Sequence, residues 1–257
     1  MTTDADLCAR AFVSALRLLV REMPGMYEVP GADGVTGVVS GMPVPTLNGV
    51  FTEVTRPGHA DLAKVAAMMA GLAVPWCIQL RGRPDAGAEQ LGGQYGLSGR
   101  EVLPLMLRRA GPGPPELPVR EPVARRVRAV GPAGRARFAA GLAAGFGAPP
   151  ELMAPFASPE FFAIEAAVPY AAEEDGEVVA VGLGIFEGEF TGIYNIATRP
   201  SHRGQGYGRA VTSRIVADGI ARGAPLAYLQ SSMAGYPLYE SMGFRTLERW
   251  TYLVPGE

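Results

Sequence analysis

The sequence predicts a mixed α/β fold, and three observations lead to this prediction. Apolar runs of strand length alternate with longer segments of helical periodicity along most of the 257 residues. A glycine-rich turn at 203–208 joins the apolar run at 193–197 to a helical pattern in which apolar residues recur every four positions. Part of this order occurs a second time in the chain, which indicates an internal repeat.

The composition is that of a globular protein. Hydrophobic residues make up 48% and charged residues 19% of the chain, which suits one large or two modest domains. The net charge of −2 gives no attraction for nucleic acid, and no apolar run is long enough to span a membrane. Cys8 and Cys77 stand far apart and form no disulfide or zinc pattern. We therefore expect a cytoplasmic protein that binds no metal.

A proline- and glycine-rich segment separates two halves of the chain. Residues 111–118 suit an extended linker better than a helix or a central strand. We therefore expect an N-terminal domain at 1–110, a linker at 111–118 and a C-terminal domain at 119–257. The patterns predict helices at 4–23, 61–72, 133–146 and 151–156, a helix after the glycine-rich turn, and short helices before the strands at 103–108 and 245–254. They predict further strands within 37–54 and at 76–80, 123–129, 161–169, 178–186, 190–197 and 224–229.

The glycine-rich turn has the properties of a phosphate-binding loop. It follows a predicted strand and opens a predicted helix. The first N–H groups of a helix lack intrahelical acceptors, and the helix dipole is positive there. Gly204, Gly206 and Gly208 place no Cβ between the main chain and an anion. The turn therefore indicates a pyrophosphate ligand.

The spacing discriminates among three kinds of phosphate loop. A nucleotide P-loop ends in Gly-Lys-Ser/Thr, which is absent here. A dinucleotide fingerprint needs a glycine where Arg209 stands and an acidic residue near the end of the next strand, whereas Asp218 falls within the predicted helix. The third pattern, Arg/Gln-x-x-Gly-x-Gly/Ala, matches Arg203, Gly206 and Gly208.

The segment downstream supports the third pattern. Leu238-Tyr239-Glu240 precedes Gly243-Phe244, in which the glycine suits a helix C-cap and Phe244 starts a strand. Together with the loop, this order resembles the GCN5-related N-acetyltransferases, the GNAT superfamily, over about residues 120–257. The resemblance implies a mixed-sheet GNAT fold and binding of an acyl-coenzyme A.

A weaker copy of this pattern occurs in the first half of the chain. Thr55-Arg56-Pro57-Gly58-His59 parallels Thr198-Arg199-Pro200-Ser201-His202, and each segment lies between a predicted strand and a predicted helix. In the first copy, His59-Ala60-Asp61 stands where the glycines would be. We therefore expect two GNAT-like lobes, of which the N-terminal one is degenerate and does not hold a pyrophosphate.

The resemblance assigns residues to the coenzyme. Main-chain groups of the loop would hold the pyrophosphate, and the strand before it would pair with the pantetheine arm. Ser232 stands where the family often has an asparagine that reaches the arm, and Ser231 is an equal candidate. The expected coenzyme-binding residues are Ile196, Ala197, Thr198, Arg203, Gly204, Gln205, Gly206, Tyr207, Gly208, Arg209 and Ser232.

The resemblance also names a catalytic acid and leaves the base open. Tyr239 occupies the position of the family's tyrosine near the departing sulfur, and a phenol with a pKa near ~10 is a proton donor at neutral pH. The strand at 190–197 carries no carboxylate. Glu165, Glu187 and Glu189 read better as surface charges, and a water oriented by Tyr194 and Asn195 is the alternative base.

The predicted function is transfer of an acetyl group from acetyl-CoA to a primary amine of a small molecule by direct attack. Residues expected to line the acceptor site are Tyr194, Asn195, Phe146, Met153 and Phe156. Two alternatives stay open: another acyl-CoA enzyme on this scaffold, such as a longer-acyl transferase or a decarboxylase, and a silent coenzyme-binding or interaction protein. A homodimer is also left open.

Overall fold

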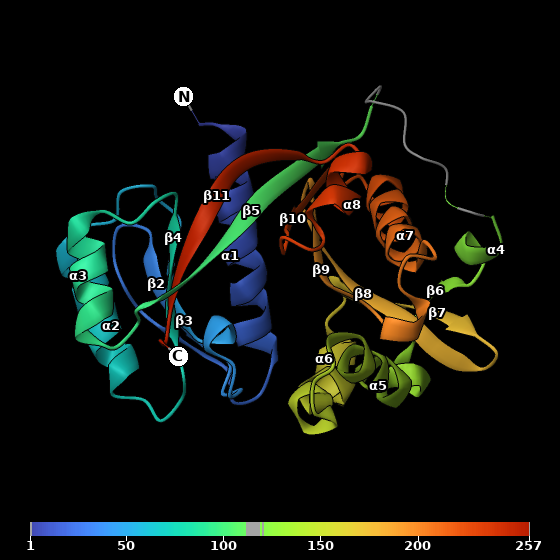
Figure 1. Ribbon diagram of the computed structural model, residues 1–257, viewed down its shortest axis with the longest axis horizontal. Helices are drawn as coiled ribbons and strands as arrows, with labels where there is room; N and C mark the ends of the chain where they lie inside the picture. Colours follow the sequence, from blue (N-terminus) through green and yellow to red (C-terminus); the bar gives the residue numbers. More distant parts are fainter. Residues whose placement is uncertain (1, 112–118, 120, 257) are drawn as a thin grey trace. The chain divides into compact units, whose positions relative to one another are not determined.

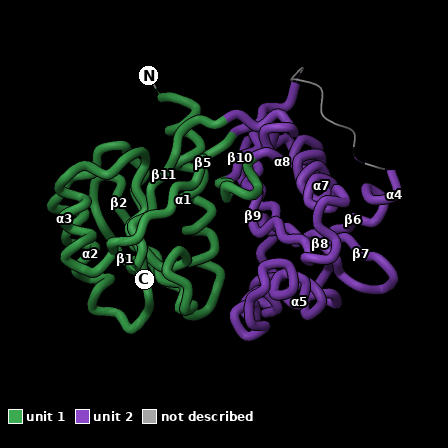
Figure 2. The backbone as a smooth tube through the Cα atoms, in the orientation of Figure 1, with its two compact units in different colours: residues 1–106, 230–236, 246–257 green, residues 107–229, 237–245 purple. Residues whose placement is uncertain are grey.

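A computed structural model describes residues 2–111, 119 and 121–256 (Figure 1). The chain divides into two compact units, which Figure 2 colours separately. Unit 1 comprises Met1–Met106, Gln230–Tyr236 and Thr246–Glu257, and unit 2 comprises Leu107–Leu229 and Pro237–Arg245. Apart from Gly111, the predicted linker lies outside the described residues, and the domain division at this linker stays a prediction.

Unit 1 is built on six strands in the order β1-β2-β3-β4-β11-β5. The pairs β1–β2, β2–β3 and β4–β11 are antiparallel, whereas β3 and β4 are parallel. The elements are α1 (Asp4–Glu22), β1 (Tyr27–Val29), β2 (Val35–Val39), η1 (Pro45–Leu47), β3 (Gly49–Thr52), α2 (His59–Ala70), β4 (Cys77–Arg81), α3 (Ala86–Gln94), most of β5 (Gly99–Arg109) and nearly all of β11 (Arg245–Val254).

The apolar stripe of α2 covers one face of this sheet. Leu62, Val65 and Met69 recur at helical spacing and are fully buried. They belong to one cluster with Val50 of β3 and Ile78 of β4. Burial of these apolar side chains stabilises the packing of the helix on the strands through the hydrophobic effect.

The last strand of the chain is part of the core of unit 1. Trp250 of β11 is fully buried, and its ring lies edge-on to Phe12 of α1 at 5.4 Å. Arg81 of β4 forms a two-pronged ion pair with Glu248 of β11, with N–O distances of 2.7 and 3.0 Å. Asp6 of α1 lies 2.9 Å from the same guanidinium, whose side chain is 2% exposed. The guanidinium therefore ties α1, β4 and β11 together.

Unit 2 has five strands in the order β10-β9-β8-β7-β6. All neighbours are antiparallel except β9 and β10, which are parallel. The elements are α4 (Glu121–Ala124), β6 (Val127–Ala129), η2 (Pro132–Gly134), α5 (Arg135–Phe146), η3 (Pro150–Ala157), α6 (Pro159–Ala163), β7 (Ala167–Glu174), β8 (Glu177–Glu187), β9 (Phe190–Thr198), η4 (Pro200–His202), α7 (Tyr207–Ala221), most of β10 (Leu226–Gln230) and most of α8 (Tyr236–Ser241).

Two helices of unit 2 cover opposite faces of its sheet. A Cβ on Gly182 of β8 would lie 2.6 Å from Val211 of α7, so the absence of a side chain lets this helix approach. A Cβ on Gly141 of α5 would lie 2.7 Å from Val181, the preceding residue of β8. Because successive strand residues point to opposite faces, α7 and α5 lie on opposite sides of the strand.

The mixed α/β prediction is confirmed, but two predicted strands begin later than expected. The strand predicted at 123–129 begins at Val127 because residues 121–124 form α4. The strand predicted at 161–169 begins at Ala167 because residues 159–163 form α6. Ser158 caps α6 by accepting a hydrogen bond from the Phe161 N–H at 3.1 Å, and Pro159 suits the first helical turn.

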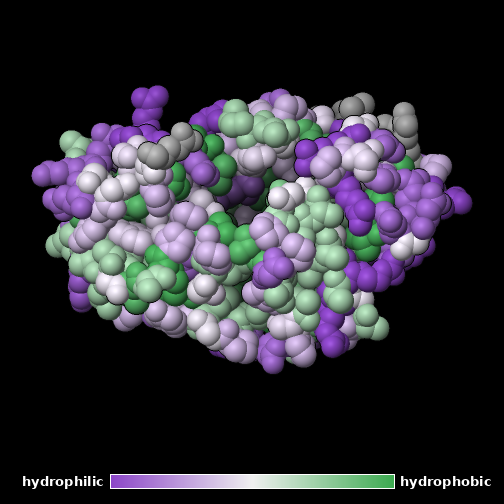
Figure 3. Space-filling model, turned by 60° about the horizontal axis from the view of Figure 1, so that its bottom comes forward, coloured by the Kyte–Doolittle hydropathy of each residue, from purple (hydrophilic) through white to green (hydrophobic). Residues whose placement is uncertain are grey.

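Hydrophilic and hydrophobic residues both occur on the surface that Figure 3 shows. In the view of Figure 3, purple hydrophilic and green hydrophobic residues are interspersed over the face that is visible. Among the residues that the structure describes, no helix combines the length and the apolar character needed to cross a membrane.

Candidate functional site

The glycine-rich loop of unit 2 connects β9 to α7. Gly204 has φ +74° and Gly206 has φ +92°, in the left-handed region that side chains rarely adopt. Gly206 is the N-cap residue of α7, and no side chain caps this helix. The sequence pattern therefore folds locally into the expected strand, turn and helix.

Main-chain donors gather at the start of α7. The first intrahelical bond runs from the Ala210 N–H to the Gly206 carbonyl at 3.0 Å. The N–H groups of Tyr207, Gly208 and Arg209 therefore precede the helical ladder. With the positive end of the helix dipole, they form a setting suited to an anion.

Two side chains of the loop bind backbone carbonyls. Arg203 donates from Nε to the Thr198 carbonyl at 3.2 Å and from Nη2 to the Gly145 carbonyl at 3.0 Å. Gln205 donates from Nε2 to the Ser201 carbonyl at 3.1 Å. Both side chains thus shape the loop, while the glycines leave its outer side open.

Tyr207 anchors the loop through partners that the sequence did not reveal. Its hydroxyl donates to the Glu174 carboxylate at 2.7 Å and accepts from Arg126 at 2.7 Å, and Arg126 also contacts Glu174. The hydrogen bonds from Tyr207 and Arg126 lower the pKa of Glu174. Glu174 ends β7 and Arg126 precedes β6, so no local sequence signal links them to Tyr207.

An opening between two strands lies beside this loop. The parallel register of β9 and β10 pairs Phe190 with Leu226 and ends where Gly192 pairs with Tyr228. Beyond this point β9 continues to Thr198. The segment 193–198 therefore has main-chain groups on its β10 side that take part in no pair of this ladder.

A bulge lies in the open part of β9. Asn195 has φ +54°, one of the few left-handed non-glycine residues among those described, and the register between β8 and β9 shifts there. Ile196 faces α7, because a Cβ built on Gly182 would contact both Ile196 and that helix. Ala197 faces α5, because it leaves no room for a Cβ on Gly145 of that helix. The predicted residues Ile196, Ala197 and Thr198 therefore line the open edge.

Tyr239 lies on α8 with a buried ring and a raised pKa. The residue is 8% exposed, and its ring lies edge-on to Phe244 at 5.9 Å. Burial raises the pKa of Tyr239 to about 12. Among the residues that the structure describes, none forms a hydrogen bond with this hydroxyl. The phenol is therefore protonated at neutral pH and can donate its proton to a ligand.

The helix α8 packs on the first turn of α7. Arg209 donates from Nη2 to the Ser241 hydroxyl at 2.6 Å. A Cβ built on Gly208 would lie 3.4 Å from Leu238, which precedes Tyr239. Gly243 has φ +82°, as expected for the residue that ends this helix. The position of Tyr239 is thus coupled to the loop by side-chain contacts.

The residues predicted to line the acceptor site differ in how deeply they are buried and in which element they lie. Phe146 ends α5 and is 50% exposed, whereas Phe156 of η3 packs edge-on against Phe161 at 5.3 Å. Met153 is half-buried on the same 3-10 helix. Tyr194 and Asn195 lie on the open part of β9. The structure thus brings the first three to the α5 side of unit 2.

Ser231 and Ser232 belong to unit 1. The Ser231 hydroxyl donates to the Ser232 carbonyl at 2.7 Å, and the Ser232 hydroxyl accepts from the Gly235 N–H at 3.1 Å. These bonds stabilise the turn before α8. A contact from Ser232 to the coenzyme stays a prediction.

The candidate carboxylates lie away from the open end of β9. Glu187 pairs with Phe190 where the β8–β9 hairpin turns, and Glu189 lies in the turn. Four residues of strand, or about 13 Å, separate Phe190 from Tyr194. Glu165 is exposed between α6 and β7.

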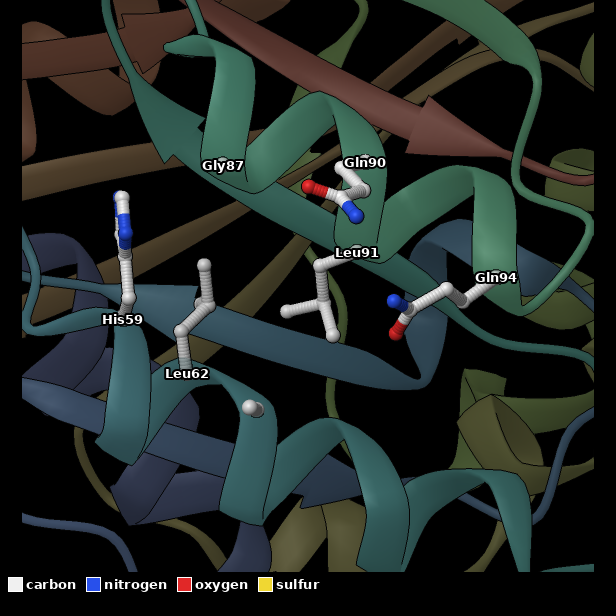
Figure 4. Close-up of a pocket in the computed structure, with 7 residues that line it drawn as sticks. His59, Leu62, Gly87, Gln90, Leu91 and Gln94 are labelled. Atoms are coloured by element: carbon white, nitrogen blue, oxygen red, sulfur yellow. The ribbon is translucent and has the colours of Figure 1, made fainter.

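The segment of unit 1 in which the sequence predicts a second, degenerate copy of the loop has a different chemistry. His59 begins α2, and its Nε2 lies 2.9 Å from the carboxylate of Asp85, which caps α3 by accepting from the Ala88 N–H at 2.9 Å. Figure 4 shows His59 at one end of a pocket of about 250 Å³ between the two helices and Gln94 at the other end. The pocket is lined by His59, Leu62, Ala63, Gly87, Gln90, Leu91 and Gln94.

Carboxylates already stand at the N-termini of α2 and α3 in unit 1. The hydrogen bond from the Ala88 N–H and the contact with His59 lower the pKa of Asp85. Asp61 lies in the first turn of α2, where its carboxylate would be 3.1 Å from a Cβ on Gly58. These charges satisfy the positive helix ends that an anion would otherwise use. Within the described part of the chain, no group of three potential metal ligands comes together.

Comparison with known proteins finds a family match for part of the chain. Residues 144–244 match the model of the acetyltransferase (GNAT) family. An acetyltransferase of Pectobacterium atrosepticum is 31% identical over 80 residues, which are 30% of this chain and 57% of that protein. The chain therefore spans 57% of the length of this curated relative.

Two solved structures share the fold at low sequence identity. A GCN5-related N-acetyltransferase from Kribbella flavida is 18% identical with a TM-score of 0.68, and the match covers 100% of this chain and 98% of that one. A GCN5-related N-acetyltransferase from Sphaerobacter thermophilus is 17% identical with a TM-score of 0.57, covering 87% of this chain and 78% of that one. The residues that match the acetyltransferase (GNAT) family model, 144–244, contain both the loop and the open strand pair.

Proposed function

We propose that unit 2 binds acetyl-CoA and transfers its acetyl group to the primary amine of a small molecule by direct attack. The observation that carries this proposal is the open segment 193–198 of β9 beside the uncapped start of α7. An extended amide-containing arm can pair with the open strand, and a pyrophosphate can bind the helix N-terminus.

The coenzyme supplies the activated acyl group, and this chain supplies binding and orientation. The main-chain N–H groups of Tyr207, Gly208 and Arg209 would hold the pyrophosphate, with Gly204 and Gly206 shaping the turn. The open edge at Ile196, Ala197 and Thr198 would hold the arm. These assignments rest on main-chain groups, which explains why glycine spacing carries the signal.

Tyr239 is proposed to protonate the departing thiolate. Its phenol stays protonated because burial raises the pKa of Tyr239 to about 12. A hydroxyl without a described protein partner is available to a ligand. For the amine's proton, a water oriented by Tyr194 and Asn195 is the acceptor that β9 supports best, since this strand has no carboxylate.

We further propose that unit 1 descends from a second copy of this fold and holds no coenzyme. The order β3, α2, β4, α3, β5 parallels β9, α7, β10, α8, β11, and each series starts with a parallel strand pair. Asp85 and Asp61 stand at its helix N-termini, where they would repel a pyrophosphate. One coenzyme per chain is therefore the expected stoichiometry.

The proposal is tested by titrating coenzyme A into the protein in a calorimeter. We expect one site per chain and a gain in unfolding free energy of about 2.7 kcal/mol at a hundredfold excess over Kd. Gly208→Ala should fold, because its Cβ would make an ordinary 3.4 Å contact with Leu238, yet it should weaken coenzyme binding at least tenfold. Gly93→Ala in α3, which has open space around it, is the matched control and should bind like wild type.

Transfer is tested separately by thiol release from acetyl-, propionyl- and malonyl-CoA with pooled primary amines. Amine-dependent release from acetyl-CoA supports the proposed reaction. Absence of coenzyme binding to the wild type would refute it. Binding without thiol release would favour a silent protein, and amine-independent release from malonyl-CoA would favour a decarboxylase.

A further inference from the structure

The glycine stretch of the coenzyme loop is held by a side chain at each end. Gly204 and Gly206 lie between Arg203, which binds two backbone carbonyls, and Tyr207, which begins α7 and is 2% exposed. Glycine loses more conformational freedom on ordering than any other residue, so a glycine stretch does not keep one conformation unaided. The shape of this stretch therefore depends on what holds Tyr207 in place.

The hydroxyl of Tyr207 is bound from two neighbouring strands. It donates to one carboxylate oxygen of Glu174 at 2.7 Å and accepts from Nη1 of Arg126 at 2.7 Å. The same Nη1 contacts the other oxygen of Glu174. Glu174 ends β7 and Arg126 directly precedes β6, and these two strands pair with each other. Hydrogen bonds to charged groups are the stronger kind, so the sheet fixes the start of α7 firmly.

A residue on the other side of the glycine stretch joins the same cluster. The Nε2 atom of His202 lies 3.4 Å from the Glu174 carboxylate, and its ring lies edge-on to Tyr207 at 6.0 Å. Its Nδ1 atom lies 2.9 Å from the Ser201 hydroxyl. The carboxylate of Glu174 thus has contacts at positions 202 and 207, on both sides of the glycines.

Two other residues of β7 make similar contacts that do not reach the loop. The carboxylate of Glu173 lies 3.1 Å from Arg137 of α5, on the sheet face away from α7. The hydroxyl of Tyr170 donates to Asp218 at 2.8 Å. Asp218 follows the start of α7 by eleven residues, or about three turns. The attachment of the loop is therefore specific to Glu174 and is not shared by the rest of β7.

We propose that Glu174 and Arg126 are positioning residues for the coenzyme: by holding the Tyr207 hydroxyl, they fix the glycine stretch and the first N–H groups of α7 in the conformation that binds the pyrophosphate. This inference rests on the proposed binding of coenzyme A. Because the loop is ordered before the ligand arrives, less conformational entropy is lost on binding. Arg126 lies outside residues 144–244, so its part in this arrangement is not contained in the family match.

The test measures the Kd of coenzyme A by calorimetry in Tyr207→Phe and Glu174→Ala. Tyr207→Phe keeps the buried ring and removes only the hydroxyl. Loss of this attachment should raise the Kd about three- to tenfold in both variants. The matched controls are Tyr170→Phe and Glu173→Ala, which remove the same chemical groups from contacts of β7 that do not reach the loop. Both controls should keep the wild-type Kd.

Hydrogen exchange of the protein without coenzyme separates a local effect from a general loss of stability. The amides of residues 203–209 should exchange faster in Tyr207→Phe than in wild type, and those of α2 in unit 1 should exchange at the wild-type rate. An unchanged Kd in either loop variant would overturn the positioning role. An equal rise of the Kd in the controls, or faster exchange throughout the chain, would overturn it as well. Absence of coenzyme binding to the wild type would instead refute the proposed function.

Discussion

Replacement of Tyr239 by phenylalanine isolates one hydroxyl group in the proposed mechanism. The ring stays, so the edge-on contact with Phe244 at 5.9 Å and the burial of the aromatic carbons are kept. Because no described residue bonds the hydroxyl, its removal breaks no hydrogen bond within the described part of the chain. We therefore expect the unfolding free energy of Tyr239→Phe to stay within about 1 kcal/mol of wild type.

The expected effect on catalysis is much larger. A lost general acid typically lowers the rate by about 10²–10⁴, which corresponds to about 2.7–5.4 kcal/mol of transition-state stabilisation. Burial raises the pKa of Tyr239 to about 12, so the phenol is protonated across the neutral range and deprotonation of this group should leave kcat unchanged between pH 6 and 9.

The assay is thiol release under single-turnover conditions, which measures the chemical step, with coenzyme affinity measured by calorimetry. We expect Tyr239→Phe to bind coenzyme A like wild type and to turn over slowly. Tyr236→Phe, on the same helix, is the matched control and should retain activity. Wild-type single-turnover rates in Tyr239→Phe would remove Tyr239 from the mechanism.

Two further predictions concern the ion-pair network of unit 1. Glu248→Gln should lower the unfolding free energy, measured in urea, by about 3–5 kcal/mol, because it leaves the Arg81 guanidinium, which is 2% exposed, partly uncompensated. Arg125 forms an exposed ion pair, so Arg125→Gln should lower the unfolding free energy by at most about 1 kcal/mol. Equal losses in the two variants would contradict this reasoning. Hydrogen bonds from Thr3, together with Arg81, lower the pKa of Asp6 in the folded protein. The ionised Asp6 therefore stabilises the fold above its unfolded pKa of about 3.9, and this stabilisation is lost as the pH falls. When urea unfolding is measured at pH 5 and pH 3, the unfolding free energy should decrease less in Asp6→Asn than in wild type.

The coenzyme loop was predictable because its determinants are local. Gly204 and Gly206 adopt left-handed conformations that other residues avoid, and Gly243 ends α8 in the same way. Helix starts and stops depend on residues within one turn, so a window of about ten residues contains the signal. The strands at 123–129 and 161–169 were misplaced at their starts where a short apolar run also suits a helix.

Partners distant in sequence were decided only by the tertiary structure. Tyr207 finds Glu174 and Arg126, and Tyr194 finds Tyr228, across more than thirty residues in each case. Nothing in a hydroxyl or a carboxylate specifies which distant group it will meet.

The amino-acid sequence alone specified the loop, the helix that follows it and the Gly-Phe end of α8, because these features depend on backbone conformations that few residues allow. It did not determine that the final strand, β11, lies beside β4 in unit 1, paired from Trp250 to Leu253. Backbone hydrogen bonds are the same for every strand, so pairing is selected by side chains such as Arg81 and Glu248 that come together only in the folded chain.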